Sequence, residues 1–265
     1  MPCARVERCH HCRAFFTLSG ARSTVRQFSL RYNPSAMCGR YRRSRADKQI
    51  AEHFDIAEEI EWSPRYNIAP AQRVAVVRQN PERPVRQFSL VRWGLIPFWA
   101  KDANISYKMI NARAETVAEK PAYRESFKSR RCLTPADGFY EWKKEGKTKQ
   151  PFHFGMHDDS IFAFAGLWDR WKNPLGEVVE TRSILTTTPN ALLADVHDRM
   201  PVILPLEHYD LWLDPGFKGT DDLKELLRPF EAGLMRRYPV STRVNLVKND
   251  DPECAAELRE RSVTA

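Results

Sequence analysis

Cys38 is the residue whose chemistry stands out in this sequence, because it follows a methionine in the tetrapeptide Met37-Cys38-Gly39-Arg40. Removal of Met37 would leave Cys38 with a free α-amine two carbons from its thiol. Such a 1,2-aminothiol captures aldehydes, since the amine forms an imine that the sulfur closes into a five-membered thiazolidine. An internal cysteine cannot do this, because its nitrogen belongs to a planar amide. The tetrapeptide therefore predicts a nucleophilic N-terminal cysteine, provided that Cys38 becomes residue one.

A glutamate in an aromatic setting is the second candidate. In the segment 137–142, strand alternation would place Phe139 and Glu141 on one face and Tyr140 and Trp142 on the other. A carboxylate there is either paired with a cation or desolvated, and desolvation raises its pKa toward the range of a useful acid or base. Taken alone, Glu141 is equally consistent with a structural, solvated or paired side chain.

His197, Asn111 and Arg113 are further candidates with ordinary alternatives. His197 follows an amphipathic segment, where a lone histidine also suits a purely structural role. Asn111 and Arg113 are two residues apart, so in a strand both would point to the same side. Their alternatives are a turn asparagine and an exposed arginine.

Residues 1–36 differ from the rest of the chain in composition. They contain six arginines, no lysine and a single acid, Glu7, whereas the whole chain has a net charge of +8. We expect an extension that is disordered and removed, or a misassigned start; its arginine-rich, acid-poor makeup also fits a mitochondrial transit peptide. Its histidines and cysteines lack a second ligand pair at zinc-finger distance, so we expect no metal site; they are Cys3, Cys9, His10, His11 and Cys12.

The remaining residues suit one domain, which we place at 37–250, followed by a C-terminal tail at 251–265. The longest strongly apolar stretch, Ile161–Trp168, is too short to span a membrane. Only three cysteines follow the extension, and this odd number favours a reduced, cytoplasmic protein. The sequence has no glycine-rich phosphate loop, so we expect no cofactor, and we expect a monomer.

Short strands interleaved with a few helices predict an α+β fold, a mostly antiparallel, barrel-like β core with several short helices. Helices are expected after Ser44, whose spacing to Asp47 resembles a capping box, and after Thr188, Pro205 and Thr220. The expected strands are Arg73–Arg78, Arg86–Trp93, Gly138–Trp142, Pro151–Phe154, Ser160–Leu167, Val178–Thr187 and Arg243–Val247.

Seven segments occur in an order that identifies a family resemblance. They are Met37–Tyr41, Arg65–Pro70, Trp93–Trp99, Asn111–Thr116, Cys132–Trp142, Phe164–Trp168 and His197–Pro201. Together they closely resemble the SOS-response-associated peptidase family, the abasic-site processing proteins. The resemblance covers Met37 to about Val247, and a chance match of seven ordered motifs is not credible. The extension departs from the family pattern, in which the cysteine follows the initiator methionine or a short leader that is removed.

The resemblance implies roles for particular residues. Carried over by position, the catalytic cysteine is Cys38, and the active-site asparagine, glutamate and histidine are Asn111, Glu141 and His197. The bond between Met37 and Cys38 would be the cleavage site. Positions that in the family face the DNA backbone hold Arg40, Arg113 and Arg199, and the aromatic residues expected to stack on or separate bases are Trp93, Phe98 and Trp99. For these aromatics, simple core packing is the alternative.

The resemblance also implies the reaction and the partner. The partner would be single-stranded DNA carrying an abasic site, whose ring-opened form is an aldehyde, so the protein would be nucleoid-associated when bound to damaged DNA. An α-amine of pKa about 8 is roughly a tenth neutral at pH 7, whereas lysine is neutral at well under a thousandth. The amine and thiol of Cys38 would form a thiazolidine crosslink, and the same residues would cleave the bond before Cys38.

Three alternatives remain open from the sequence. The first is a conventional cysteine peptidase, in which His197 activates the Cys38 thiolate and Asn111 or Glu141 orients the histidine. The second is a module that only binds and shields damaged DNA, and the third is a zinc protein that uses the cysteines of the extension.

Overall fold

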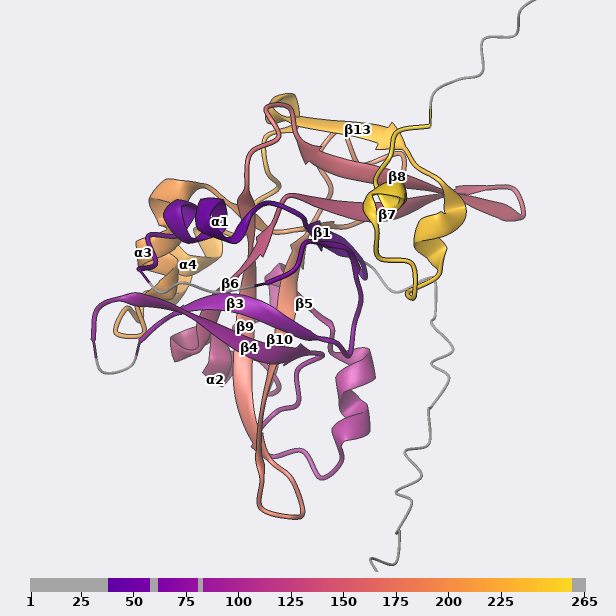
Figure 1. The fold of residues 1–265 in the computed structure, drawn as a ribbon. Coiled ribbons are helices and arrows are strands. Elements are labelled where there is room, and N and C mark those ends of the chain that lie inside the picture. Colours follow the sequence, from indigo (N-terminus) through magenta and orange to yellow (C-terminus); the bar gives the residue numbers. More distant parts are fainter. Residues whose placement is uncertain (1–37, 58–61, 81–82, 259–265) are drawn as a thin grey trace, which may run out of the picture. The chain divides into compact units, whose positions relative to one another are not determined.

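A closed ring of five strands forms the centre of the fold in the computed structural model, which describes residues 38–57, 62–80 and 83–258. The ring runs β10-β4-β3-β6-β9 and closes where β9 pairs with β10 (Figure 1). Only the β10–β4 pair in this ring is parallel. Its members are β3 (Arg73–Gln79), β4 (Arg86–Trp93), β6 (Arg131–Ala136), β9 (Phe162–Lys172) and β10 (Val178–Thr187). The expected barrel-like α+β fold is confirmed.

Two of the barrel strands, β6 and the first half of β9, are buried on both faces. Every residue of β6 is buried, and β9 carries the apolar run that begins at Phe162. Gly166 on β9 permits a close approach, because an added Cβ would lie 3.0 Å from the Cys132 sulfur and 3.1 Å from the Ser183 carbonyl oxygen. Three short strands extend this sheet: β5 (Asn111–Arg113), β11 (Met200–Pro201) and β12 (Ile203–Leu204).

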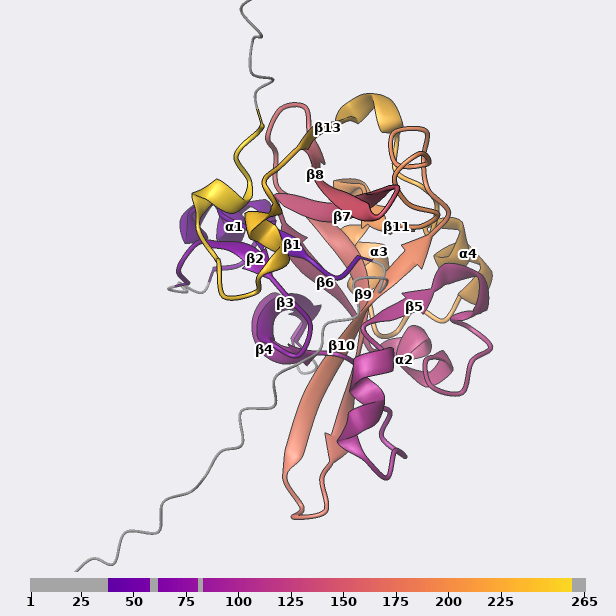
Figure 2. The ribbon, with the colours of Figure 1, turned by 90° about the vertical axis from the view of Figure 1, so that its right-hand side faces the viewer.

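A second, five-stranded sheet lies against the barrel, above it in the views of Figures 1 and 2. Its order is β13-β8-β7-β1-β2, from β1 (Tyr41–Arg43), β2 (Arg65–Ile68), β7 (Gly138–Glu145), β8 (Thr148–Met156) and β13 (Met235–Pro239). Phe139 and Phe154 on one face belong to the same buried cluster as Trp93 and Phe164 of the barrel. Tyr140 on the other face packs with residues of the C-terminal segment.

The described helices are short. The four α-helices are α1 (Asp47–His53), α2 (Arg124–Ser129), α3 (Tyr209–Leu213) and α4 (Thr220–Glu225). Six 3₁₀ turns are Ala103–Lys108, Ala114–Thr116, Leu206–His208, Ala232–Leu234, Thr242–Asn245 and Pro252–Cys254. None of the helices in the described ranges has the length and apolar character needed to cross a bilayer.

Two local predictions near the start of helices are wrong. Ser44 donates its hydroxyl hydrogen to Asp137 instead of forming a capping box, although α1 does begin at Asp47. The segment after Thr188 forms successive turns and not a helix, although the Asn190 side-chain oxygen accepts the backbone N–H groups of Leu192 and Leu193 as an N-cap would.

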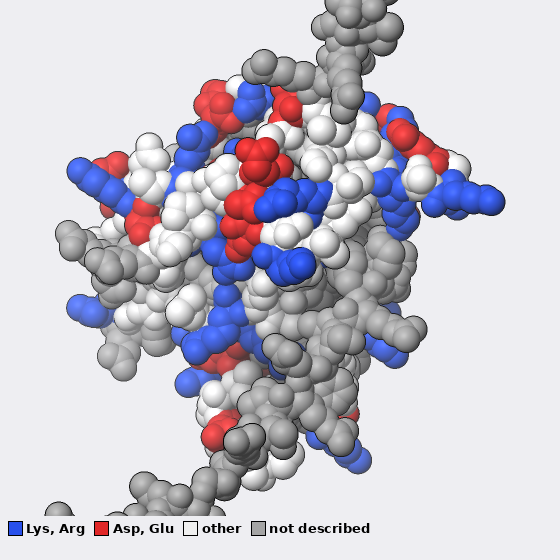
Figure 3. All heavy atoms as spheres, turned by 45° about the vertical axis from the view of Figure 1, so that its right-hand side comes forward, with Lys and Arg blue, Asp and Glu red and all other residues white. Residues whose placement is uncertain are grey.

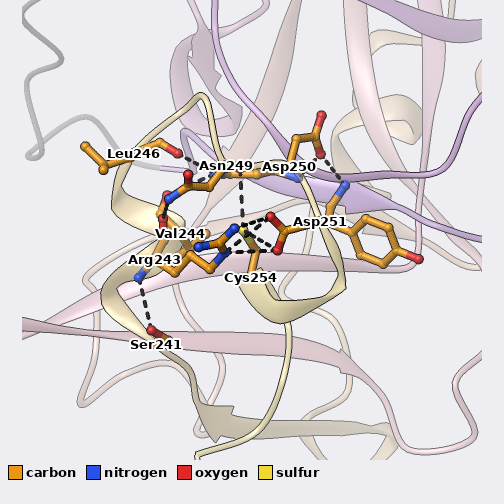
Figure 4. A network of polar contacts seen from close by, with 10 residues as sticks. Ser241, Arg243, Val244, Leu246, Asn249, Asp250, Asp251 and Cys254 are labelled. Carbon is orange, nitrogen blue, oxygen red and sulfur yellow. Dashed lines mark hydrogen bonds and ion pairs between the residues drawn. The ribbon is translucent and has the colours of Figure 1, made fainter.

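The strand expected at Arg243–Val247 is also wrong, since the chain forms a 3₁₀ turn there. Its carbonyl groups bond to side chains of the five-stranded sheet instead of to a neighbouring strand. The Asn67 side-chain amide donates to the carbonyl oxygens of Val244, Leu246 and Asn249 at 2.7 to 3.1 Å. Figure 4 shows this C-terminal segment, in which the Arg243 guanidinium faces the Asp251 carboxylate.

Asn67 should therefore be essential for holding the C-terminal segment. It is fully buried, and its side-chain oxygen also accepts a hydrogen bond from Arg40 at 2.9 Å. We expect Asn67→Ala to lower the free energy of unfolding by about 2–4 kcal/mol, because several buried polar groups lose their partner at once. Chemical denaturation measures this. Asn104→Ala, at an exposed turn, should change the free energy by no more than about 0.5 kcal/mol; equal effects of the two substitutions would contradict the prediction.

Candidate active site

Antiparallel pairing of β1 with β7 brings Cys38 to Glu141. Tyr41 is opposite Phe139 in this pair, and the Tyr140 amide donates to the Arg40 carbonyl at 3.1 Å. The ladder continues toward Cys38, whose backbone N–H donates to the Glu141 carboxylate oxygen Oε1 at 2.7 Å. The nitrogen that would become the α-amine is thus already hydrogen-bonded to a carboxylate.

Glu141 is buried, with only 2% of its surface exposed. The predicted alternation along β7 is confirmed, since Phe139 belongs to the cluster shared with the barrel, and Tyr140 and Trp142 to the cluster on the opposite face. Burial raises the pKa of Glu141 above its ordinary value, while the charge of His197 and the hydrogen bonds from Cys38 act in the opposite direction. This carboxyl group is therefore suited to hold a proton nearer to neutral pH than an ordinary glutamate.

The Cys38 thiol is 3% exposed and is held in its protonated form. Burial, the charge of Glu141 and a hydrogen bond to that carboxylate raise the pKa of the thiol well above its ordinary value, and the charge of Arg199 lowers it only in part. A conventional cysteine peptidase needs the opposite, a thiolate stabilised by cationic neighbours. The electrostatics of Cys38 do not favour that alternative in the intact chain.

His197 approaches this pair from the segment before β11. The Arg199 backbone N–H lies 3.1 Å from the ring nitrogen Nδ1. The Asp198 carboxylate lies 3.0 Å from the same Nδ1, which can accept from Arg199 when it carries no proton and can donate to Asp198 when it does. Because the charge of His197 lowers the pKa of Glu141, the two side chains interact electrostatically.

Asn111 and Arg113 lie on β5, beside the end of β10. Asn111 is opposite Ile184 and Arg113 is opposite Thr186 in this parallel pair. The Arg199 guanidinium donates to the Thr186 carbonyl oxygen at 2.6 Å, which places Arg199 at the same strand end. The ends of β5, β10 and β11 thereby bring Asn111, Arg113 and Arg199 together, and Arg199 in turn acts on Cys38.

The three candidate DNA-backbone arginines have different environments. Arg40 is 1% exposed, and its guanidinium donates to Asn67 and to the carbonyls of Val244 and Asn245. The expectation that Arg40 contacts a phosphate is corrected by this burial, because Arg40 anchors the C-terminal segment instead. Arg113 is exposed, whereas Arg199 is largely buried.

A residue that our sequence reasoning passed over, Glu115, holds Arg199 in place. Its two carboxylate oxygens accept hydrogen bonds from Arg199 at 2.5 and 2.8 Å, and these bonds lower the pKa of Glu115. Glu115 stands in the same short motif as Asn111 and Arg113. The sequence around Glu115 gave no sign of this ion pair, because Arg199 is 84 positions further along the chain.

The candidate aromatic residues also separate into two groups. Trp93 is 1% exposed and donates its indole N–H to the Ile110 carbonyl oxygen at 3.0 Å, so the expected stacking on bases is corrected to core packing. Phe98 and Trp99 are 58% and 49% exposed. Both side chains are therefore accessible at the surface, and two neighbouring exposed aromatic residues are informative about where a ligand can bind.

Charged side chains do not form one continuous basic field on the face drawn in Figure 3, where acidic groups lie among the lysines and arginines. On this face, attraction for a polyanion would have to come from local clusters. Within the described residues there is no group of three or more side chains suited to bind a metal. Met37 and the cysteines and histidines of the extension lie outside those residues.

Comparisons with known proteins agree on a family. The model of the family described as SOS response associated peptidase matches residues 37–247. The abasic site processing protein YoqW of Bacillus subtilis is 46% identical over 221 residues, which cover 82% of this chain and 98% of that protein. The abasic site processing protein HMCES of Xenopus tropicalis is 32% identical over 226 residues, covering 74% of this chain and 67% of that protein. A crystal structure of a protein from Bacteroides thetaiotaomicron superposes with a TM-score of 0.76 at 29% identity, covering 84% of this chain and all of that one.

The contact between Cys38 and Glu141 can be tested through the thiol. We expect Glu141→Gln to lower the pKa of the Cys38 thiol, because the substitution removes the negative charge that opposes thiolate formation. The pH dependence of alkylation, followed for each cysteine by peptide mass spectrometry, reports the shift. Cys132, whose pKa is raised to about 12 by burial in the barrel, serves as the reference that should not move. An unchanged Cys38 profile would mean that the carboxylate does not govern the thiol.

Proposed function

Because the chain belongs to the SOS response-associated peptidase family, we propose that it processes abasic sites in single-stranded DNA through Cys38. In this proposal Cys38 becomes the first residue after Met37 and the preceding segment are removed. Its amine and thiol then form a covalent thiazolidine with the ring-opened sugar and shield the lesion. The relatives named abasic site processing proteins support the substrate class.

The contact between the Cys38 nitrogen and Glu141 carries the proposal. At 2.7 Å, Glu141 is the direct hydrogen-bond partner of the atom that would attack the aldehyde. Once that nitrogen is an amine, the carboxylate can take a proton from the ammonium form and leave the neutral nucleophile. The raised pKa of Glu141 favours its protonated form, from which the carboxyl group can return a proton to a substrate.

The proposed crosslinking proceeds in two steps. The neutral amine adds to the aldehyde carbon and gives a carbinolamine, which loses its hydroxyl group as water after Glu141 supplies a proton. The thiol then adds to the imine carbon, its sulfur forming the second bond to that carbon while its proton passes to the nitrogen. A protonated thiol suits this step, because a buried thiolate beside Glu141 would be costly before the imine forms.

His197 and Asn111 have supporting roles in the proposal. In its imidazolium form, with Asp198 at 3.0 Å from Nδ1, His197 would donate the Nε2 proton to the sugar ring oxygen during ring opening. Asn111 would orient the amine or the sugar by a hydrogen bond from its side chain.

The same residues can account for cleavage of the bond before Cys38. Water would add to the Met37 carbonyl carbon, and Glu141 would donate a proton to the departing Cys38 nitrogen, its hydrogen-bond partner. Cys38 has a backbone φ of 44°, in the left-handed region that is strained for a residue with a side chain. Hydrolysis would release that strain, because φ ceases to be a constrained torsion once Cys38 begins the chain.

Contacts with DNA would come from the exposed members of the candidate set. Arg113 is free to approach a phosphate, and Phe98 and Trp99 can stack on bases beside the lesion. Arg199 could join them if a phosphate replaced Glu115, whose carboxylate is partly exposed to solvent. Single-stranded DNA is the expected partner, since stacking in a duplex would keep an abasic sugar away from a buried cysteine.

The crosslink itself is the decisive test. A chain that begins at Cys38, mixed with single-stranded DNA containing one abasic site, should give an adduct that survives denaturing electrophoresis. Cys38→Ala should abolish the adduct, whereas Cys254→Ala should not. A chain with a glycine added before Cys38 that cannot be removed should also be inactive, because its cysteine nitrogen is an amide. Undiminished adducts from that chain would refute the proposal, and retained peptidase activity would favour a conventional cysteine peptidase.

The role of Glu141 gives a quantitative prediction. We expect Glu141→Gln to slow adduct formation by about 10²–10⁴-fold, the usual contribution of a general acid or base. Single-turnover time courses on the same DNA measure the rate. Glu145→Gln, at the exposed end of the same strand, is the matched control and should leave the rate within about twofold of wild type. Equal rates for the two variants would remove Glu141 from the reaction.

A further inference from the structure

A groove with three arginines lies on the outer surface of the barrel, apart from the residues of the candidate site. Its volume is about 600 Å³, and it is lined by Arg73, Leu90, Arg92, Arg170, Val178, Val179 and Glu180. These residues come from β3, β4, β9 and β10. We call this set of residues the outer groove.

Two arginines of the outer groove face each other directly. Arg73 on β3 is the antiparallel partner of Arg92 on β4. Side chains at directly opposite positions have Cβ atoms about 4.5–5.5 Å apart, and like charges there are destabilising. Among the described residues neither arginine has an acidic partner within ion-pair distance, and the Arg92 guanidinium lies over the ring of Tyr107, at 5.9 Å from its centroid. The pair thus retains a repulsion that a bound anion would relieve.

The acid of the outer groove is already neutralised. Glu180 is bonded to Arg78 at 2.8 Å and to Arg170 at 3.3 Å. Its single negative charge is therefore shared between two cations and does not balance Arg73 and Arg92. Leu90 and Val178 are exposed beside these charges, so the groove combines free positive charge with apolar surface.

The outer groove and the exposed aromatic pair share one strand. The Phe98 amide donates to the Asp169 carboxylate at 3.1 Å, and the Trp171 indole donates to the Ala100 carbonyl oxygen at 2.6 Å. Asp169 and Trp171 are the immediate neighbours of Arg170 on β9, and strand alternation points their side chains to the face opposite that of Arg170. The loop that carries Phe98 and Trp99 therefore packs on one face of β9, and the other face contributes Arg170 to the groove.

We infer that the outer groove binds the phosphodiester backbone of the DNA strand that flanks the lesion. Arg73 and Arg92 would hold one or two phosphates between them, and Leu90 and Val178 would contact the apolar faces of sugars. A strand stacked on Phe98 and Trp99 would reach the groove by passing around β9 to its other face. This inference rests on the proposed function for its ligand, but the groove can be tested without the crosslinking reaction.

The test measures binding of the full chain to an unmodified, fluorescently labelled 25-nucleotide single strand between 50 and 200 mM KCl. Each lost phosphate contact should reduce the slope of log K against log salt by about 0.7. We therefore expect Arg73→Gln/Arg92→Gln to reduce the slope by about 1.4 and to weaken binding about tenfold at 100 mM salt. Arg73→Lys/Arg92→Lys should retain most of the slope.

The control removes the same net charge elsewhere. Lys224→Gln/Arg228→Gln, at the end of α4, should leave the slope and the affinity at wild-type values. If the glutamine pair at Arg73 and Arg92 binds with the wild-type slope and affinity, the outer groove is not a DNA site, and an acidic protein would become the better candidate. A loss of affinity equal to that of the α4 control would likewise overturn the inference. Absence of crosslinks from the chain that begins at Cys38 would refute the proposed function, and the salt slopes measured here would still show whether the outer groove binds DNA.

Discussion

One buried hydrogen bond, from the Cys38 nitrogen to the Glu141 carboxylate, is the contact on which the candidate site depends. A carboxylate removed from water is unfavourable unless it is bonded or takes up a proton. Glu141 has a donor from Cys38 and the nearby charge of His197, and its pKa is still raised. The site therefore holds an acid whose pKa is raised, in direct contact with the nitrogen that would become an amine if the chain began at Cys38.

The rest of the fold can be understood as the support for that contact. Cys38 reaches Glu141 only because β1 pairs with β7, and β1 is held from its other side by β2 and by the C-terminal segment. Arg40, two residues after Cys38, bonds to Asn67 on β2 and to carbonyls near Val244, which are about 200 positions away in the chain. On the barrel, Asn111 lies on β5, and Arg199, just before β11, bonds to the Thr186 carbonyl oxygen of β10. The position of Cys38 is thus fixed by residues from both ends of the described chain.

Local patterns predicted much of this arrangement, and long-range partners decided the rest. The bounds of β4 and β10 agree with the expected strands, since each follows a clear apolar and β-branched pattern. The face of β7 on which Glu141 lies was predicted from the alternation of side chains along the strand alone. The sequence pattern could not show that Trp93 is buried and Phe98 exposed. The two lie five residues apart in one aromatic motif, and only the folded chain determines which of them is covered. The burial of Arg40 was equally inaccessible, since its acceptors are carbonyl groups of a segment that the pattern assigned to a strand.

The placement of the arginines limits how this protein can attract DNA. Five of them are buried: Arg40, Arg43, Arg131, Arg182 and Arg199. Arg131 bonds to the carbonyls that end α2 and α3, and Arg182 lies over the Trp93 ring at 4.4 Å, so these charges serve the interior. The net charge of the whole sequence, +8, consequently overstates the positive charge that a phosphate would meet at the surface. Because screening limits such attraction to about 8–10 Å at physiological salt, affinity must depend on the few arginines that are exposed and unpaired near the exposed aromatic pair. This constraint makes the positions of individual arginines, and not the basic composition of the chain, the determinant of where a strand can lie.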